Sequence, residues 1–204
     1  MNPLNSVRGS IFAGVIVAIV IAYFIGQPHV WNELLWYAHG LTRWLHIMSG
    51  VMWIGLLWYF NVVQTPGMAA AAADKGGPGG AGISKYIAPR ALFWFRWAAV
   101  ATWLTGAWYL YGSANFLNAF TFGHFGEDGY GLKIGIGAWL GTIMLFNVWV
   151  LIWPNQKKIL GLVPATDEEK AGARKVAAMA SRTNFVLSIP MLMCMGAAIH
   201  GLPF

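Results

Sequence analysis

Five long apolar runs constrain the fold of this chain more than any other feature of its sequence. They cover about residues 11–26, 39–63, 92–112, 133–153 and 183–202. Each run is close to the roughly 20 residues that an α-helix needs to cross a hydrocarbon core of about 30 Å. We therefore predict an all-α integral membrane protein in which residues 1–204 form a single membrane domain, a five-helix transmembrane bundle.

The basic residues predict how this bundle is oriented. Eleven of the 13 Lys and Arg residues precede the first run, lie between or beside the second and third, or lie between the fourth and fifth. Only Arg43 and Lys133 fall on the other side. Because Lys and Arg concentrate on the cytoplasmic side of membrane proteins, we expect a cytoplasmic N-terminus and a periplasmic C-terminus in a bacterial inner membrane. The basic charge is thus explained by orientation, and we expect no nucleic-acid partner.

The histidines all fall on the outer side of the predicted bundle: His29, His39, His46, His124 and His200. His46 is the deepest, about 10 Å below the start of its helix at 1.5 Å per residue. An ionisable side chain at that depth is costly and marks a functional candidate. Two interpretations remain open: His46 binds a haem iron, or it hydrogen-bonds a neighbouring helix.

One face of the second run carries the candidate cofactor-binding residues His39, Arg43, His46, Gly50 and Trp53. Gly50, one turn below His46, leaves room either for a flat macrocycle or for a closely packed helix, since small residues are common at membrane-helix crossings. In the fifth run, His200 lies in the same leaflet. His46 and His200 are the best pair for the axial ligands of a bis-histidine haem b, and His39 is the competing second ligand.

Two cations belong to the same candidate site. Arg43 and Lys133 both lie near the outer boundary, where long basic side chains commonly reach back to the headgroups. Their joint functional interpretation is a pair of cations for haem propionates or for an anionic substrate. Since no C-x-x-C-H motif occurs around the single Cys194, we expect no covalently attached haem in this chain.

Three local patterns predict structure rather than chemistry. Residues 67–82 are rich in Ala and Gly and predict a flexible connection. Thr166 and Glu169 form a capping-box pattern ahead of a helix that continues into the fifth run. The glycines of the fourth run indicate close helix packing: Gly131, Gly135, Gly137 and Gly141.

Two segments carry a resemblance to a known family. They are RWLHIMSGVMWIGLLWYFN at 43–61 and SRTNFVLSIPMLMCMGAAIH at 181–200. Both resemble the N-terminal membrane region of bacterial membrane-bound urate oxidases, in which the membrane part is joined to, or works with, a cytochrome c. A fainter likeness links the second run to HemJ-type protoporphyrinogen oxidases and CopD-type copper proteins. The HemJ likeness implies a haem b associated with His46 and with Lys133.

These observations lead to three hypotheses about function. The first is a haem b-binding membrane redox protein of the urate oxidase-like type, which oxidises a small organic substrate and passes electrons to a periplasmic cytochrome c. The alternative is a non-catalytic accessory subunit of a larger respiratory or photosynthetic membrane complex, with other subunits and the lipid bilayer as partners. A copper-handling permease is a third, weaker hypothesis.

Overall fold

The computed structural model describes residues 3–25, 34–124 and 129–202. Every regular element in these ranges is helical, which confirms the predicted all-α fold class. The chain divides into two compact units, Met1–Leu41 and Thr42–Phe204. The boundary falls inside one helix, α2 (Leu34–Trp58), so a single membrane domain stays a prediction. His29 lies outside the described residues.

The first unit contains the short helix η1 (Pro3–Asn5), the helix α1 (Val7–Ile25) and the start of α2. None of the residues of α1 is buried by the protein, although most of its side chains are apolar. An apolar helix of this length is typical of a segment that crosses a membrane.

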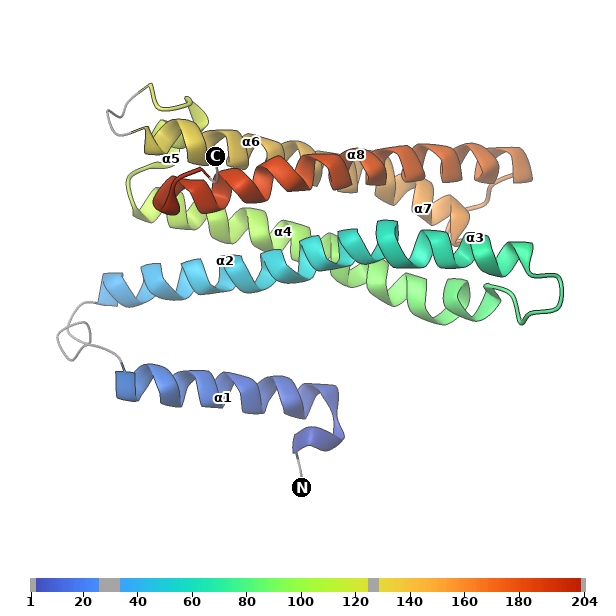
Figure 1. Ribbon diagram of the computed structural model, residues 1–204, viewed down its shortest axis with the longest axis horizontal. Helices are drawn as coiled ribbons and strands as arrows, with labels where there is room; N and C mark the ends of the chain where they lie inside the picture. Colours follow the sequence, from blue (N-terminus) through green and yellow to red (C-terminus); the bar gives the residue numbers. More distant parts are fainter. Residues whose placement is uncertain (1–2, 26–33, 125–128, 203–204) are drawn as a thin grey trace. The chain divides into compact units, whose positions relative to one another are not determined.

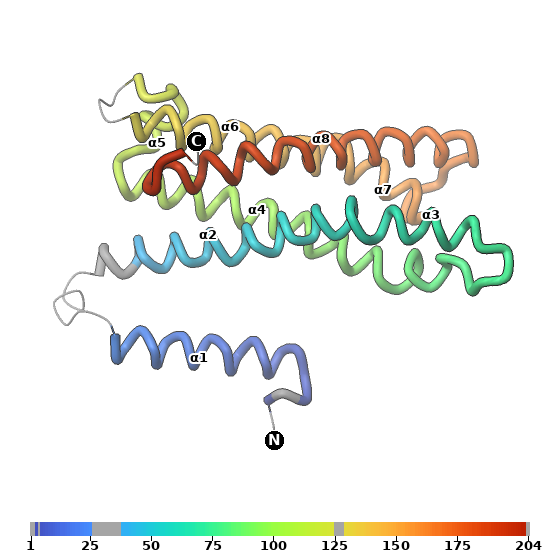
Figure 2. The backbone as a smooth tube through the Cα atoms, viewed as in Figure 1, coloured from blue at the N-terminus to red at the C-terminus, as the bar shows by residue number. Residues whose placement is uncertain are grey.

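The second unit is a bundle of antiparallel helices, and Figures 1 and 2 show their course. After α2 the chain forms η3 (Tyr59–Gln64), α3 (Thr65–Ala73), η4 (Ile83–Ile87), α4 (Ala88–Gly112), α5 (Phe116–Phe120), α6 (Tyr130–Phe146), η5 (Asn147–Ile152), α7 (Trp153–Ile159) and α8 (Asp167–His200). Helix α8 packs along α6, η5 and α7, while α4 packs against α5, α6 and η5. The end of α4, the start of α6 and the end of α8 lie together at one end of the unit (Figure 1).

Among the described residues, four helical segments are long and apolar enough to cross a membrane: Val7–Ile25, Ala38–Ala73, Tyr130–Ile159 and Asp167–His200. They correspond to four of the five predicted runs. The remaining run, 92–112, is also helical and lies within the 25-residue helix α4, which is not among these four. The chain therefore has several membrane-length helices, and the count of five spans stays a prediction.

Three π-helical turns stand directly before prolines. In η3, η4 and η5 the closing bond runs five residues back, from Thr65 to Phe60, from Ala88 to Ile83 and from Trp153 to Val148. Each is followed by a proline at the second position of the next helix. A proline has no N–H group, and its ring clashes with the carbonyl four residues earlier. Widening the preceding turn lets the helix continue without a break.

The structure corrects one local prediction and confirms another. The flexible connection predicted for 67–82 is wrong for residues 67–73, because α3 continues through the alanine run to Ala73. Alanine has the highest helix propensity, and it outweighs the glycines that come only later. The capping box is confirmed: Thr166 Oγ1 accepts from the Glu169 N–H, and Glu169 Oε2 accepts from the Thr166 N–H. Helix α8 then continues without interruption to His200.

The interior of the second unit is apolar and carries a small polar network. Its apolar core includes Leu57, Phe95, Met144, Val148 and Ile152. Within it, Asn184 is fully buried and donates from Nδ2 to the Met144 carbonyl at 2.9 Å. The Asn147 Nδ2 group donates to Asn184 Oδ1 at 2.8 Å. These two bonds tie α8 to the junction of α6 and η5.

Replacing Asn184 with alanine tests the strength of this network. We expect Asn184→Ala to lower the free energy of unfolding by roughly 0.6–2 kcal/mol, the span of values for hydrogen bonds between membrane helices. The measurement is reversible unfolding of the detergent-solubilised protein. The matched control is Thr183→Ala, because Thr183 is exposed and bonds only the Met179 carbonyl of its own helix. Equal losses in the two variants would contradict a stabilising role for the network.

Candidate functional site

His46 joins α2 to α4 through its imidazole ring. The Nδ1 atom lies 2.8 Å from the carbonyl oxygen of Thr102, and the side chain is half-buried. A carbonyl can only accept, so Nδ1 carries the proton and donates it. In the neutral ring, Nε2 is then the unprotonated nitrogen, with a lone pair in the plane of the ring. The predicted hydrogen bond to a neighbouring helix is therefore present, and it leaves one ring nitrogen available.

Gly106 on α4 makes this hydrogen bond possible. A Cβ atom on Gly106 would lie 2.8 Å from His46 Cε1 and 2.9 Å from His46 Nδ1, both too close for real contacts. In an α-helix a side chain covers the turn on its N-terminal side. A side chain at position 106 would cover the turn that carries the Thr102 carbonyl. Its absence leaves that carbonyl accessible to the imidazole.

The second glycine of the crossing, Gly50 on α2, faces Thr102. A Cβ atom at Gly50 would meet only Thr102 Cγ2, at 3.7 Å, which is an ordinary van der Waals contact. His46 therefore lies against Gly106, and Gly50 lies against Thr102, an antiparallel register of α2 on α4. Because that contact leaves room for a small side chain, it does not decide between the two interpretations of Gly50, a closely packed helix or a flat macrocycle.

Trp53 occupies the next turn of the same face of α2. Its side chain is 2% exposed, and it belongs to the apolar core. The indole Nε1 is enclosed, and no described residue accepts a hydrogen bond from it. A buried indole N–H normally donates a hydrogen bond. The Trp53 N–H, two turns after His46 on the same helix, is unusual because it has no acceptor among the described residues.

The other predicted site residues range from half-buried to exposed. His200 is the last residue of α8 and is exposed. Lys133 is half-buried near the start of α6, at the end of the unit where α8 finishes (Figure 1). Arg43 is exposed on α2, and His39 lies on the part of α2 that belongs to the first unit. No group of three or more His, Cys, Asp or Glu side chains with metal-binding geometry occurs among the described residues.

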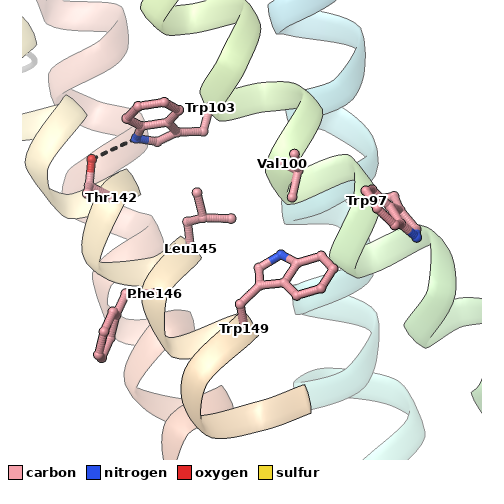
Figure 3. Close-up of a pocket in the computed structure, with 7 residues that line it drawn as sticks. All are labelled: Trp97, Val100, Trp103, Thr142, Leu145, Phe146 and Trp149. Carbon is pink, nitrogen blue, oxygen red and sulfur yellow. Dashed lines mark hydrogen bonds between the residues drawn. The ribbon is translucent and has the colours of Figure 1, made fainter. Parts of the chain in front are cut away.

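An apolar groove lies on another face of α4, toward α6 and η5 (Figure 3). Its volume is about 510 Å³, and its lining residues are Trp97, Val100, Trp103, Thr142, Leu145, Phe146 and Trp149. The Trp103 indole donates to Thr142 Oγ1 at 2.9 Å (Figure 3). None of the predicted haem residues lines this groove, so it is separate from the His46 site.

Three of the four predicted glycines of α6 pack closely against neighbouring elements, whereas a Cβ at Gly141 would meet nothing within 4 Å, so the prediction is wrong for Gly141. A Cβ at Gly131 would meet the side chain of Asn118, and one at Gly135 would meet the backbone of Ala119. A Cβ at Gly137 would lie within 3.4 Å of Cys194 Cβ and closer still to Met195. These contacts bring α5 and α8 against α6, which positions Lys133 and the last turns of α8.

Comparison with known families gives one match. Residues 116–203 match the family described as urate oxidase N-terminal. This stretch, which is less than half of the chain, is similar to that family. The match begins at α5, ends beyond α8 and includes 181–200, Lys133 and His200, so the predicted resemblance is confirmed there. It does not extend to 43–61, and the likeness to HemJ-type and CopD-type proteins stays a prediction. No curated protein and no solved structure matches the chain significantly.

Sequence reasoning found His46 and missed the residues that hold it. Thr102 and Gly106 form a small-xxx-small pair on the third apolar run, the same signal that was read on the fourth run. That pattern predicts a close crossing. It does not say which helix crosses there, and a backbone carbonyl has no sequence signature at all.

Adding a single methyl group at position 106 tests this geometry. We expect Gly106→Ala to displace the His46 ring, break its bond to Thr102 and lower the free energy of unfolding by roughly 1–3 kcal/mol. Gly55→Ala is the control, because a Cβ at Gly55 on α2 would meet nothing within 4 Å. Thermal unfolding of both variants provides the measurement. A Gly106→Ala protein as stable as the control would contradict the close approach.

Proposed function

We propose that this chain is a haem b-binding membrane redox protein of the urate oxidase-like type, with His46 as an axial ligand. The main observation that supports this proposal is the hydrogen bond between His46 and Thr102. Histidines that bind metals usually donate their other ring N–H to a carbonyl or a carboxylate, which fixes both the tautomer and the ring orientation. His46 has that arrangement, with Nε2 left to bind iron.

The surroundings of His46 fit a ligand of this kind. The ring is held between α2 and α4, because its Nδ1 is bonded to α4 and Gly106 closes off movement on that side. A ligand held on two rigid helices loses little freedom when it binds. A bound haem would supply one-electron redox chemistry, with its potential set by the axial ligands and their hydrogen bonds. In this role the Thr102 carbonyl raises the basicity of the His46 imidazole.

The remaining roles in the proposal follow the sequence interpretation. His200 is the proposed second axial ligand, and His39 is its competitor. Arg43 and Lys133 are proposed to bind the propionates or an anionic substrate through charge-assisted hydrogen bonds. Electrons are proposed to leave to a periplasmic cytochrome c, with the protein in a bacterial inner membrane. The match of residues 116–203 to the urate oxidase N-terminal family supports this direction, since it contains both His200 and Lys133.

A second candidate function is an accessory subunit of a larger membrane complex. The observation that favours it is the position of the acidic residues. All seven Asp and Glu residues of the chain lie outside the five apolar runs. A catalytic acid or base within the membrane would then have to be a histidine, tyrosine, lysine or cysteine, or a group from a partner.

The visible spectrum of the purified protein tests the haem proposal. We expect a sharp b-type band in the reduced-minus-oxidised difference spectrum, which His46→Ala abolishes and His200→Ala abolishes or shifts. His124→Ala is the control, because His124 is a described histidine with no proposed ligand role. A folded, colourless wild-type protein, or a band that survives His46→Ala unchanged, would refute the assignment. With the band present, urate-dependent reduction of added cytochrome c distinguishes an enzyme from a subunit.

A further inference from the structure

Arg96 on α4 is a buried cation without an acidic partner. Its side chain is 7% exposed. The ion pairs among the described residues are Lys158–Glu169 and Lys170–Asp167, so Arg96 takes part in neither. Its Nε atom is enclosed and has no hydrogen-bond partner. No Asp or Glu lies within the five apolar runs, and Asp167 and Glu169 at the start of α8 are paired with Lys170 and Lys158.

One aromatic ring holds the Arg96 guanidinium in place. Its Cζ atom lies 3.5 Å from the centroid of the Trp153 ring, at the start of α7. A guanidinium stacked on an indole is attracted by the ring face and is oriented by it. The stack does not satisfy the N–H donors at the edge of the guanidinium, and it leaves the positive charge uncompensated.

A second cation lies beside the same ring. Lys157 Nζ is 5.8 Å from the Trp153 centroid, and Lys157 belongs to neither of the ion pairs described above. Both cations belong to the end of the unit that carries the basic loops, where Lys158 and Arg90 also lie. Two positive charges on one indole, with N–H donors still unused, form a site for an anion.

We propose that Arg96, Trp153 and Lys157 bind a phosphate-type oxyanion at this basic end of the bundle. Arg presents its donors in a planar fork that matches two oxygens of a phosphate, while Lys adds a point charge. The phosphate can come from an anionic phospholipid headgroup or from a soluble anion, and both have the same recognition chemistry. The site is distinct from His46, and the proposal does not depend on haem.

The test compares unfolding temperatures of the full-length protein in different lipids. Wild-type protein is reconstituted in nanodiscs of phosphatidylcholine alone and in nanodiscs that also contain phosphatidylglycerol. A ligand that binds only the folded state raises the unfolding temperature, here by roughly 5 °C for a well-occupied site. Arg96→Gln should lose that rise. Arg90→Gln, which removes the same charge from an exposed position near the start of α4, should keep it.

A second arm separates the two sources of phosphate. Inorganic phosphate is added to the delipidated protein in detergent, with sodium chloride at equal ionic strength as the control. An Arg96-dependent rise with phosphatidylglycerol alone identifies a lipid headgroup, whereas an Arg96-dependent rise with inorganic phosphate identifies a site open to soluble anions. Either result supports the proposal. No rise with either phosphate source, or equal rises in Arg96→Gln and wild type, would overturn it.

If Arg96→Gln does not fold, the variant Arg96→Lys provides the same test. The lysine retains the charge and loses both the planar stack on Trp153 and the two-donor fork. We expect its lipid-dependent rise to be clearly smaller than that of the wild type. A full rise in Arg96→Lys would contradict the stacked fork and with it the proposed site.

Discussion

The hydrogen bond between His46 and the Thr102 carbonyl is the interaction on which the account of this protein depends. It gives a half-buried imidazole the partner it needs where water is scarce, and it crosses from α2 to α4. Gly106 is required for it, because any side chain there would collide with the ring. The same bond orients the imidazole ring, and the proposed role of His46 as an iron ligand rests on this orientation.

Elsewhere in the second unit, polar side chains pair across helices without charge. Asn184 bonds Asn147, Trp58 donates to Ser188, and Asn61 donates to Ser181. These bonds join α8 to η5 and to the helix that begins at α2. Neutral donors and acceptors cost little to bury when they are matched, whereas Arg96 has no such match. The buried amides have partners within the protein, whereas the Arg96 guanidinium has no acidic partner among the described residues. We therefore infer that an anion from outside the chain pairs with it.

The sequence was sufficient to predict where the long helices lie, and it was insufficient to predict how they contact one another. Apolar run lengths predicted the membrane helices, and Thr166 with Glu169 predicted the start of α8. Local patterns of this kind contain their own physical cause. The partner of His46 is a backbone carbonyl on another helix, which no residue type announces. The π-turns before Pro66, Pro89 and Pro154 depend on how each helix accommodates a missing N–H. The second apolar run also predicted a helix that ends at residue 63, whereas the helical segment continues to Ala73.

The protonation state of the His46 ring is the direct test of whether its imidazole donates from Nδ1 to the Thr102 carbonyl and keeps Nε2 unprotonated. Nitrogen NMR of protein labelled with ¹⁵N-histidine, purified free of haem, distinguishes the two neutral tautomers of each histidine, and His46→Gln identifies the His46 signal. From the hydrogen bond to Thr102 we expect a protonated Nδ1 and an unprotonated Nε2 for His46. A proton found on Nε2 instead would mean that the ring does not donate to Thr102, and the proposed iron ligand would then lack its lone pair.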